Sequence, residues 1–140
     1  MNTQEKFTYF FSRFALFIVY VWFGALKLID ASPANPLVEQ LLAKTLPFIS
    51  FGEFIVILGI FEIAIGVLFI IPRMERLALV FLIPHMLVTI APLFLLAPVT
   101  WTGMLSPTLE GQYIIKNILI IALGIDIFME SNKVRALRRG

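Results

Sequence analysis

The residue in this sequence with the clearest capacity for chemistry is Glu62, a carboxylate in the middle of the apolar segment GIFEIAIG at residues 59–66. In a membrane helix an ionisable group is costly, so such a residue indicates a functional site by default. His85, the only histidine, stands in the next apolar segment of the chain. Histidine is the side chain most readily protonated near neutral pH. Together the two residues could hold or pass a proton.

A count of residues predicts that Glu62 and His85 lie at the same depth. Glu62 stands nine residues before Ile71 and His85 stands eight residues after Leu77, on either side of a tight turn. At the rise of an α-helix these intervals correspond to about 13 Å and about 12 Å. The sequence therefore predicts a hydrogen bond between Glu62 and His85, direct or through one water. A buried pair that only fixes helix packing is the alternative, which the sequence leaves open.

Further polar side chains stand near the opposite ends of the apolar segments. Lys116 lies about one turn inside its segment, where an unpaired ammonium is costly. Thr89 follows His85 by four residues and therefore shares its helix face. We expect a polar seam from Glu62 and His85 past Thr89 towards Lys116, which either lines a small pocket or is filled by the protein's own hydrogen bonds. Its candidate residues are Glu62, His85, Thr89, Lys27, Lys116, Asn117, Glu53, Trp101 and Tyr113, the two aromatic residues also matching a membrane-interface belt.

Several kinds of chemistry are excluded by what the sequence lacks. There is no cysteine, hence no disulfide and no thiolate metal site in this chain. One histidine is too few for a zinc site, although a single haem ligand stays formally open. No nucleophile triad, phosphate-binding glycine loop or nucleotide fingerprint occurs. We predict no metal site and no catalytic residue, and we expect no catalytic activity from the chain on its own.

The composition predicts that lipid is the solvent around these residues. Of 140 residues, 60% are hydrophobic and 14% charged, whereas soluble domains carry roughly a quarter charged residues. Four segments are long enough to cross a bilayer: residues 9–29, 52–71, 77–98 and 112–129. Spans of this kind must be helices, because lipid offers no hydrogen-bond partners to open strands. We therefore expect an all-α, four-helix transmembrane bundle that forms a single domain over residues 1–140.

The distribution of lysine and arginine predicts how the bundle is oriented. Basic residues gather in the N-terminal flank, in the turn 72–76 and in the C-terminal tail, whereas the loop 98–111 has none. By the positive-inside rule both termini are cytoplasmic. Arg13 is close enough to the end of its span to snorkel to the interface. The net charge of +2, spread over helix ends, argues against a nucleic-acid surface.

The loop between the first two spans is expected to contain a short amphipathic helix at residues 36–46. Asn35 can cap it and Pro36 can open it. Its apolar residues Val38, Leu41 and Leu42 fall on one face, so the helix should lie at the outer membrane interface. In the following span Gly52, Gly59 and Gly66 recur every seven residues, and we expect these three glycines to let a neighbouring helix approach closely.

The segments VWFGALKL, GIFEIAIGVLFIIP and PTLEGQYIIKNILIIALG resemble the DoxX-like family of small four-helix membrane proteins. The matching elements are Gly24 with Lys27, Glu62 among its glycines, and Gly111 with Lys116 and Asn117. The branch most similar to this chain includes bacterial inner-membrane proteins linked to reactive-chlorine resistance. The resemblance implies a multi-pass protein of the inner membrane with a stress-response, redox or quinone association. The loop 30–51 is short compared with that branch.

Three functions follow as hypotheses. The first is an accessory membrane protein that binds a small apolar ligand, with quinone as the possible cofactor, in the polar seam. The second is a scaffold or assembly subunit that docks another membrane protein. The third is a small proton-coupled transporter that works as an oligomer. The partners expected are the lipid bilayer and either a membrane redox protein or further copies of the chain, and no nucleic acid.

Overall fold

The computed structural model describes residues 2–137, and most of this chain is helical. Four helices are long: α1 (Thr3–Leu28), α3 (Phe51–Ile70), α4 (Glu75–Ile90) and α8 (Ile118–Leu137). Shorter elements connect them: α2 (Asn35–Thr45), α5 (Pro92–Leu95), α6 (Ala97–Thr100), β1 (Trp101–Gly103), β2 (Ser106–Pro107) and α7 (Leu109–Lys116).

Three helical segments of the described chain are long and apolar enough to cross a membrane, which indicates a membrane protein. They are Thr3–Leu28, Phe51–Ile70 and Glu75–Leu95. The first begins six residues before the expected position. The expected fourth span, 112–129, is divided between α7 and α8 at Asn117, and α8 carries charged side chains along its second half. The four-helix transmembrane bundle and its orientation therefore stay predictions.

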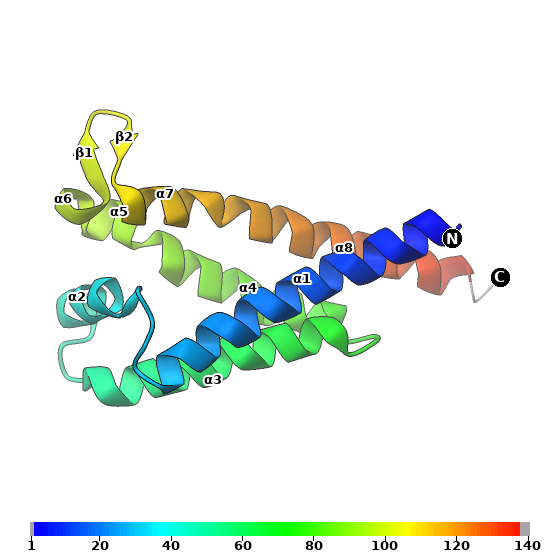
Figure 1. The fold of residues 1–140 in the computed structure, drawn as a ribbon, viewed down its shortest axis with the longest axis horizontal. Helices are drawn as coiled ribbons and strands as arrows, with labels where there is room; N and C mark the ends of the chain where they lie inside the picture. Colours follow the sequence, from blue (N-terminus) through cyan, green and yellow to red (C-terminus); the bar gives the residue numbers. More distant parts are fainter. Residues whose placement is uncertain (1, 138–140) are drawn as a thin grey trace.

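The long helices lie side by side along one axis (Figure 1). Helix α1 packs along α3, α4 packs against α3 and α8, and α8 also contacts α1. The start of α1, the α3–α4 turn and the end of α8 lie at one end of the molecule. Helix α2 and the β1–β2 hairpin lie at the other end, which we call the hairpin end.

Glycines bring α1 and α3 into backbone contact. A Cβ atom added at Gly24 would lie 2.6 Å from the carbonyl oxygen of Gly59, and one at Gly59 would lie 2.8 Å from that of Gly24. Gly66 meets Tyr20 in the same way, with 3.0 Å between such a Cβ and the tyrosine Cβ. The packing role expected for Gly59 and Gly66 is confirmed. The same role for Gly52 is wrong, because α3 extends past the end of α1 there and nothing lies within 4 Å of the added atom.

The core lies where α1, α3, α4 and α8 meet. Leu16, Ile65, Phe69, Leu82 and Ile127 are its most deeply buried large side chains. Many other large apolar residues stay on the outside, among them Phe7, Phe10, Phe11, Trp22 and Phe23 on α1. A water-soluble protein rarely keeps such a continuous apolar surface, whereas lipid would cover it without cost.

The short helix expected at 36–46 is confirmed as α2, one residue earlier. Asn35 does not cap it: the helix begins after Ala34, and the Asn35 side-chain amide donates to Asp30 Oδ1 over 2.7 Å. Leu42 is buried, as the apolar face requires. That this helix lies at the membrane interface remains a prediction.

The β1–β2 hairpin departs from the all-α expectation. Its two short antiparallel strands pair Trp101 with Pro107 and Gly103 with Ser106. The hairpin stands out sideways from the helix ends (Figure 1). Two strands of this length carry almost no periodic signal, so the sequence pattern showed only a loop.

Candidate functional site

The predicted contact between Glu62 and His85 is confirmed. Nε2 of His85 lies 3.0 Å from Oε1 of Glu62. The residues are 8% and 7% exposed. Helix α3 ends at Ile70 and α4 begins at Glu75, so a short turn holds the two helices antiparallel. Glu62 and His85 stand nearly the same number of residues from this turn, and they therefore lie at nearly the same depth.

Lys27 of α1 completes an ion pair with the other carboxylate oxygen. Its Nζ lies 2.7 Å from Glu62 Oε2, and Lys27 is 6% exposed. The distance between the two atoms is that of an ion pair. Among the described residues, Glu62 Oε2 has no partner with the geometry of a hydrogen bond. The close approach of Gly24 and Gly59 favours this contact. Helices α1 and α3 run antiparallel, so Lys27 and Glu62 lie about one turn to either side of the Gly24–Gly59 crossing, and the long lysine side chain reaches back across it.

Tyr20 is the fourth member, which sequence reasoning missed. Its hydroxyl lies 3.3 Å from Nδ1 of His85. The tyrosine ring also meets the imidazole edge-on, with 5.5 Å between ring centroids. A signal existed, since Tyr20 precedes Lys27 by seven residues and Gly24 by four, and these intervals share one helix face. We call Tyr20, Lys27, Glu62 and His85 the central cluster.

Both ring nitrogens of His85 have a partner in the central cluster. If Nε2 of His85 carries the proton and donates it to Glu62, then Nδ1 is an acceptor and the Tyr20 hydroxyl can donate to it. The negative Glu62 carboxylate is balanced by the positive Lys27 ammonium. These contacts therefore link side chains of α1, α3 and α4 in one polar set.

The other candidate residues have contacts of their own. Thr89 contacts a residue of the central cluster, because its hydroxyl donates to the backbone oxygen of His85 over 2.8 Å. Lys116 is exposed, and its Nζ lies 5.3 Å from the centre of the Tyr113 ring. Asn117 ends α7. Among the described residues, no chain of polar contacts joins Glu62 and His85 to Lys116, so the expected seam does not reach Lys116.

The last two candidates, Glu53 and Trp101, make local hydrogen bonds. The Ser50 hydroxyl, at the N-cap of α3, donates to Glu53 Oε2 over 2.6 Å. The Trp101 indole donates to the backbone oxygen of Leu93 over 2.9 Å. These bonds hold the start of α3 and the base of the hairpin, and they involve no residue of the central cluster.

A second polar cluster, which the sequence analysis did not predict, lies at the end of the molecule opposite the hairpin. Arg13 does not snorkel: its Nε donates to the carbonyl of Phe69 over 2.7 Å and its Nη2 to that of Ile70 over 3.0 Å. Its Nη1 lies 2.9 Å from Glu75 Oε1. Arg13 therefore satisfies carbonyls at the C-terminal end of α3 that the helix itself leaves open. We call Arg13, Glu75, Tyr9, Ser131 and Arg135 the terminal cluster.

The remaining members of the terminal cluster surround Glu75. The Tyr9 hydroxyl donates to Glu75 Oε1 over 3.0 Å. Arg135 Nη2 lies 3.4 Å from Glu75 Oε2 and donates to the Ser131 hydroxyl over 2.7 Å. Through one carboxylate this cluster ties α1, α4 and α8 together. The tail arginines Arg138 and Arg139 lie outside the described residues.

An apolar layer separates the two clusters along α1, α3 and α4. Leu16 lies between Arg13 and Tyr20 on α1. On α3 the intervening buried residues are Ile65 and Phe69, and on α4 they are Ala78 and Leu82. All five are at most slightly exposed and belong to one core cluster. No polar contact given for the described residues crosses this layer.

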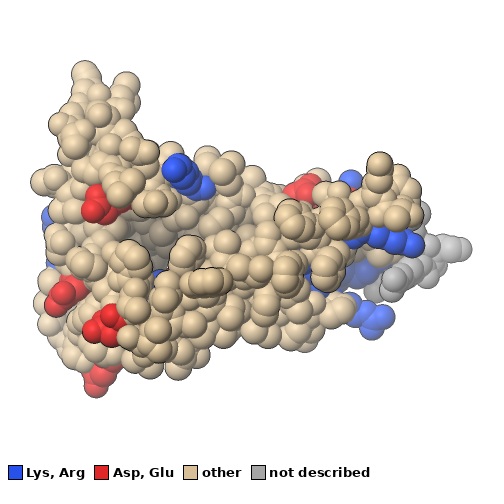
Figure 2. Space-filling model, in the orientation of Figure 1, with Lys and Arg blue, Asp and Glu red and all other residues tan. Residues whose placement is uncertain are grey.

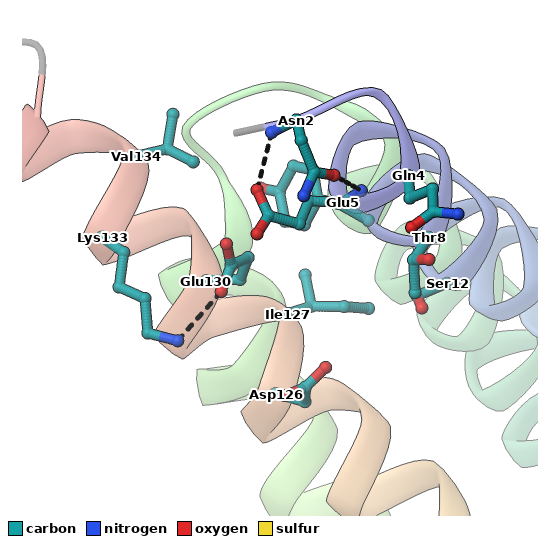
Figure 3. A pocket seen from close by; sticks show the side chains of 11 residues that line it. Asn2, Gln4, Glu5, Thr8, Ser12, Asp126, Ile127, Glu130, Lys133 and Val134 are labelled. Carbon is teal, nitrogen blue, oxygen red and sulfur yellow. Dashed lines mark hydrogen bonds and ion pairs between the residues drawn. The ribbon is translucent and has the colours of Figure 1, made fainter.

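The surface cavities of the described chain include one between α1 and α8 and one on α1 alone. One, of about 500 Å³, lies between α1 and α8 and is lined by polar side chains such as Thr8, Ser12, Asp126 and Glu130 (Figure 3). The other, of about 390 Å³, lies on the apolar face of α1 around Val21 and Trp22. Neither of these two cavities is lined by Lys27, Glu62 or His85.

Metal chemistry finds no support in the described residues, which include no group of three histidine, cysteine or acidic side chains placed to hold a metal ion. The chain matches no protein-family model, no curated protein and no solved structure. The resemblance to the DoxX-like family therefore remains a prediction from the sequence segments.

Proposed function

We propose that the chain is a multi-pass protein of the bacterial inner membrane, with four spans and cytoplasmic termini, that serves a redox system as an accessory protein. In this proposal the central cluster binds the polar head of a small apolar molecule, and a quinone is the candidate ligand. The observation that carries the proposal is the ion pair of Lys27 and Glu62, enclosed between helices with apolar outer faces.

The hydrogen-bond capacity of Lys27 supports a ligand at this position. An ammonium group has three N–H donors, and Glu62 is the one described residue that pairs with it. Buried donors without acceptors are costly, so a further oxygen near Nζ would be stabilising. A quinone carbonyl is an uncharged acceptor, and it would leave the charge balance of Lys27 and Glu62 unchanged.

The hydrogen-bonding groups of the central cluster therefore match those that a quinone head group needs. Lys27 would hold a carbonyl oxygen, while His85 and Glu62 would hold a proton within the same hydrogen-bonded set. When bound, a quinone supplies the capacity to carry two electrons and two protons. The chain's own residues would bind it and orient it, and a partner protein would supply or take the electrons.

The proposed fourth span and orientation rest on helix packing and charge. Helices α7 and α8 follow one another with one intervening residue, and α8 packs along α4 and α1. Basic side chains gather at the end that carries the start of α1 and the α3–α4 turn, whereas acidic side chains occur at both ends (Figures 1 and 2). By the positive-inside rule this pattern supports a cytoplasmic position for both termini.

A scaffold or assembly role is the second candidate. One observation favours it: the members of the central cluster bond to one another, and such a closed set can serve only to fix the packing of α1, α3 and α4. A stoichiometric membrane partner that co-purifies, together with full function of Glu62→Gln, would support this role.

Proton-coupled transport is the least supported of the three hypotheses. A transport path needs groups that relay the proton from one side to the other, whereas the apolar layer separates the central cluster from the terminal cluster on three helices. An oligomer could supply a path elsewhere. Proton flux into liposomes that disappears in His85→Ala would revive this hypothesis.

Thermal unfolding in detergent tests the quinone proposal. A ligand that binds the folded protein raises the midpoint of unfolding. Short-chain ubiquinone and menaquinone analogues should raise it for the natural chain. The double variant Lys27→Met with Glu62→Leu removes both charges of the ion pair, leaves no buried ammonium unpaired, and should lose the shift. Lys116→Met, a lysine outside the cluster, is the matched control and should keep the shift.

Two results would contradict quinone binding at the central cluster. One is a natural chain that carries no extractable quinone and shows no shift with either analogue. The other is an equal shift in the double variant and in the Lys116→Met control, which would place binding elsewhere on the molecule.

A further inference from the structure

The tip of the β1–β2 hairpin exposes two large apolar side chains. Met104 is 91% exposed and Leu105 is 89% exposed. They form the turn between Gly103 and Ser106, which pair with each other across the hairpin. Single exposed apolar residues are common on protein surfaces, but an adjacent pair at the tip of a projecting hairpin is a concentrated apolar surface.

Leu105 occupies a backbone conformation that disfavours its own side chain. Its φ angle is +61°, in the left-handed region. Two-residue hairpin turns in this region normally use glycine, asparagine or aspartate. A leucine here is strained because its Cβ approaches the following carbonyl oxygen. Strain at an exposed position with no protein contact to explain it indicates that the apolar side chain serves contact with something outside the chain.

The hairpin is held firmly at its base. The Thr108 backbone nitrogen donates to Thr100 O over 2.9 Å, and the Thr108 hydroxyl donates to Val99 O over 2.9 Å. Gly111 packs directly on the Thr100 carbonyl, with no room for a Cβ atom. The Trp101 indole bond to Leu93 ties the first strand to α5. The direction in which the tip projects is therefore set by the fold.

Position and charge point to lipid as the occupant. The candidate span Glu75–Leu95 ends six residues before Trp101, so the hairpin begins near the membrane surface. No lysine, arginine, aspartate or glutamate occurs between Arg76 and Glu110. The hairpin projects across the long axis of the molecule, which is the direction of the membrane plane, and carries no charged side chain (Figures 1 and 2).

We propose that the β1–β2 hairpin is a lateral membrane anchor, with Met104 and Leu105 inserted into the interfacial region of the lipid leaflet at the hairpin end. Apolar side chains gain free energy on moving from water into this region, and an uncharged hairpin brings no charge into it. Such an anchor would fix the height and tilt of α6 and α7, between which the hairpin is built. The proposal does not depend on quinone binding.

Site-specific fluorescence tests the anchor, because the chain has no natural cysteine. Met104→Cys carries an environment-sensitive NBD label in nanodiscs of phosphatidylethanolamine and phosphatidylglycerol. We expect blue-shifted emission, quenching by lipid-attached nitroxide, and several-fold weaker quenching by aqueous iodide than for the control. The control is the same label at Glu39→Cys, on the exposed face of α2, which iodide should quench strongly.

A second variant separates insertion from an effect of the label. Adding Leu105→Gly relieves the left-handed backbone strain, so the hairpin should stay folded, but it removes half of the apolar tip. The label at position 104 should then become more accessible to iodide.

Two outcomes would overturn the proposal. Iodide quenching equal to that of the Glu39 control would mean that the tip stands in water. Protection from both iodide and lipid nitroxide would mean that another protein surface covers the tip.

Discussion

At the scale of single residues, the Glu62 side chain joins two other helices to its own. One carboxylate oxygen lies against His85 of α4 and the other against Lys27 of α1. Loss of His85 would leave Glu62 paired with Lys27, whereas loss of Glu62 would leave a buried ammonium with no described partner. The two residues are therefore unequal even though they touch each other.

A double-mutant cycle measures this inequality. Glu62→Leu should lower the free energy of unfolding by about 3–5 kcal/mol, because it breaks a buried pair and leaves Lys27 unpaired. His85→Leu should cost less, about 1–3 kcal/mol, the range for one unsatisfied buried group. The double variant should cost less than the sum, since contacting residues couple. Unfolding in detergent by added SDS gives the values. Strict additivity would mean that the two side chains do not interact.

The glycines of α3 give a matched pair of substitutions. Gly59→Ala puts a methyl group 2.8 Å from the Gly24 carbonyl oxygen and should cost about 1–3 kcal/mol of overpacking. Gly52→Ala meets nothing within 4 Å and should be neutral or stabilise by roughly 0.5–1 kcal/mol, because alanine favours the helix. The same detergent unfolding measures both. Equal costs at the two positions would contradict the close α1–α3 contact.

Residue counting predicted part of the central cluster and missed the rest for a physical reason. Equal depth of Glu62 and His85 follows from the helical rise and one tight turn. The position of Lys27 depends on how closely α1 approaches α3, which the Gly24–Gly59 contact determines. Tyr20 depends on the same rotation of α1. The depth of a residue along a helix can be counted from the sequence of that helix alone. The rotation of a helix and its distance from a neighbour depend on how the two helices pack.

At the scale of helices and strands, Arg13 determines how α3 ends. Two of its nitrogens bind carbonyls of the last turn and a third meets Glu75, so one side chain joins α1, α3 and α4. The sequence analysis assigned Arg13 to the lipid interface because its position near a span end suits snorkelling. Its burial instead follows from the unpaired carbonyls at the helix end, which attract the nearest cation.

Loss of Arg13 should therefore destabilise the α3–α4 corner. We expect Arg13→Met to lower the free energy of unfolding by about 3 kcal/mol, since it leaves Glu75 buried with fewer partners and two carbonyls without donors. Arg76→Met is the control, because Arg76 is exposed and has no side-chain bond among the described residues. Hydrogen exchange of the last turn of α3 should speed up in Arg13→Met only. Equal stability of the two variants would contradict the capping role.

Long apolar elements were predictable and short ones were not. The first three spans and α2 appear within six residues of their expected bounds, because apolar runs and periodicity extend over many residues. The division of the fourth segment at Asn117 and the β1–β2 hairpin depend on local hydrogen bonds. Hairpin strands of two and three residues are too short for a pattern to appear.

At the scale of the whole molecule, charge and apolar surface divide it into three zones. Basic side chains gather at the end opposite the hairpin, acidic ones occur at both ends, and the middle is mainly apolar outside (Figure 2). Inside, the central cluster lies towards the hairpin end, and the apolar core separates it from the terminal cluster. A ligand would therefore reach the central cluster from the hairpin end or sideways from lipid.

Cysteine labelling tests the proposed orientation. A cysteine at Glu39 on α2 should react with an impermeant maleimide in intact bacterial spheroplasts, because α2 is placed on the outer side. A cysteine at Met74, in the α3–α4 turn, should react only after the membrane is permeabilised. The reverse pattern would invert the topology and place the hairpin in the inner leaflet.

A photoreactive azidoquinone tests most directly whether the central cluster is a ligand site. Purified protein in nanodiscs is illuminated with the probe, digested, and mapped by mass spectrometry with and without excess ordinary quinone. We predict saturable labelling of the α4 segment that contains His85, suppressed by competing quinone and absent from the Lys27→Met and Glu62→Leu double variant. Labelling confined to the outer apolar face of α1, unchanged by competitor, would contradict a quinone site at the central cluster.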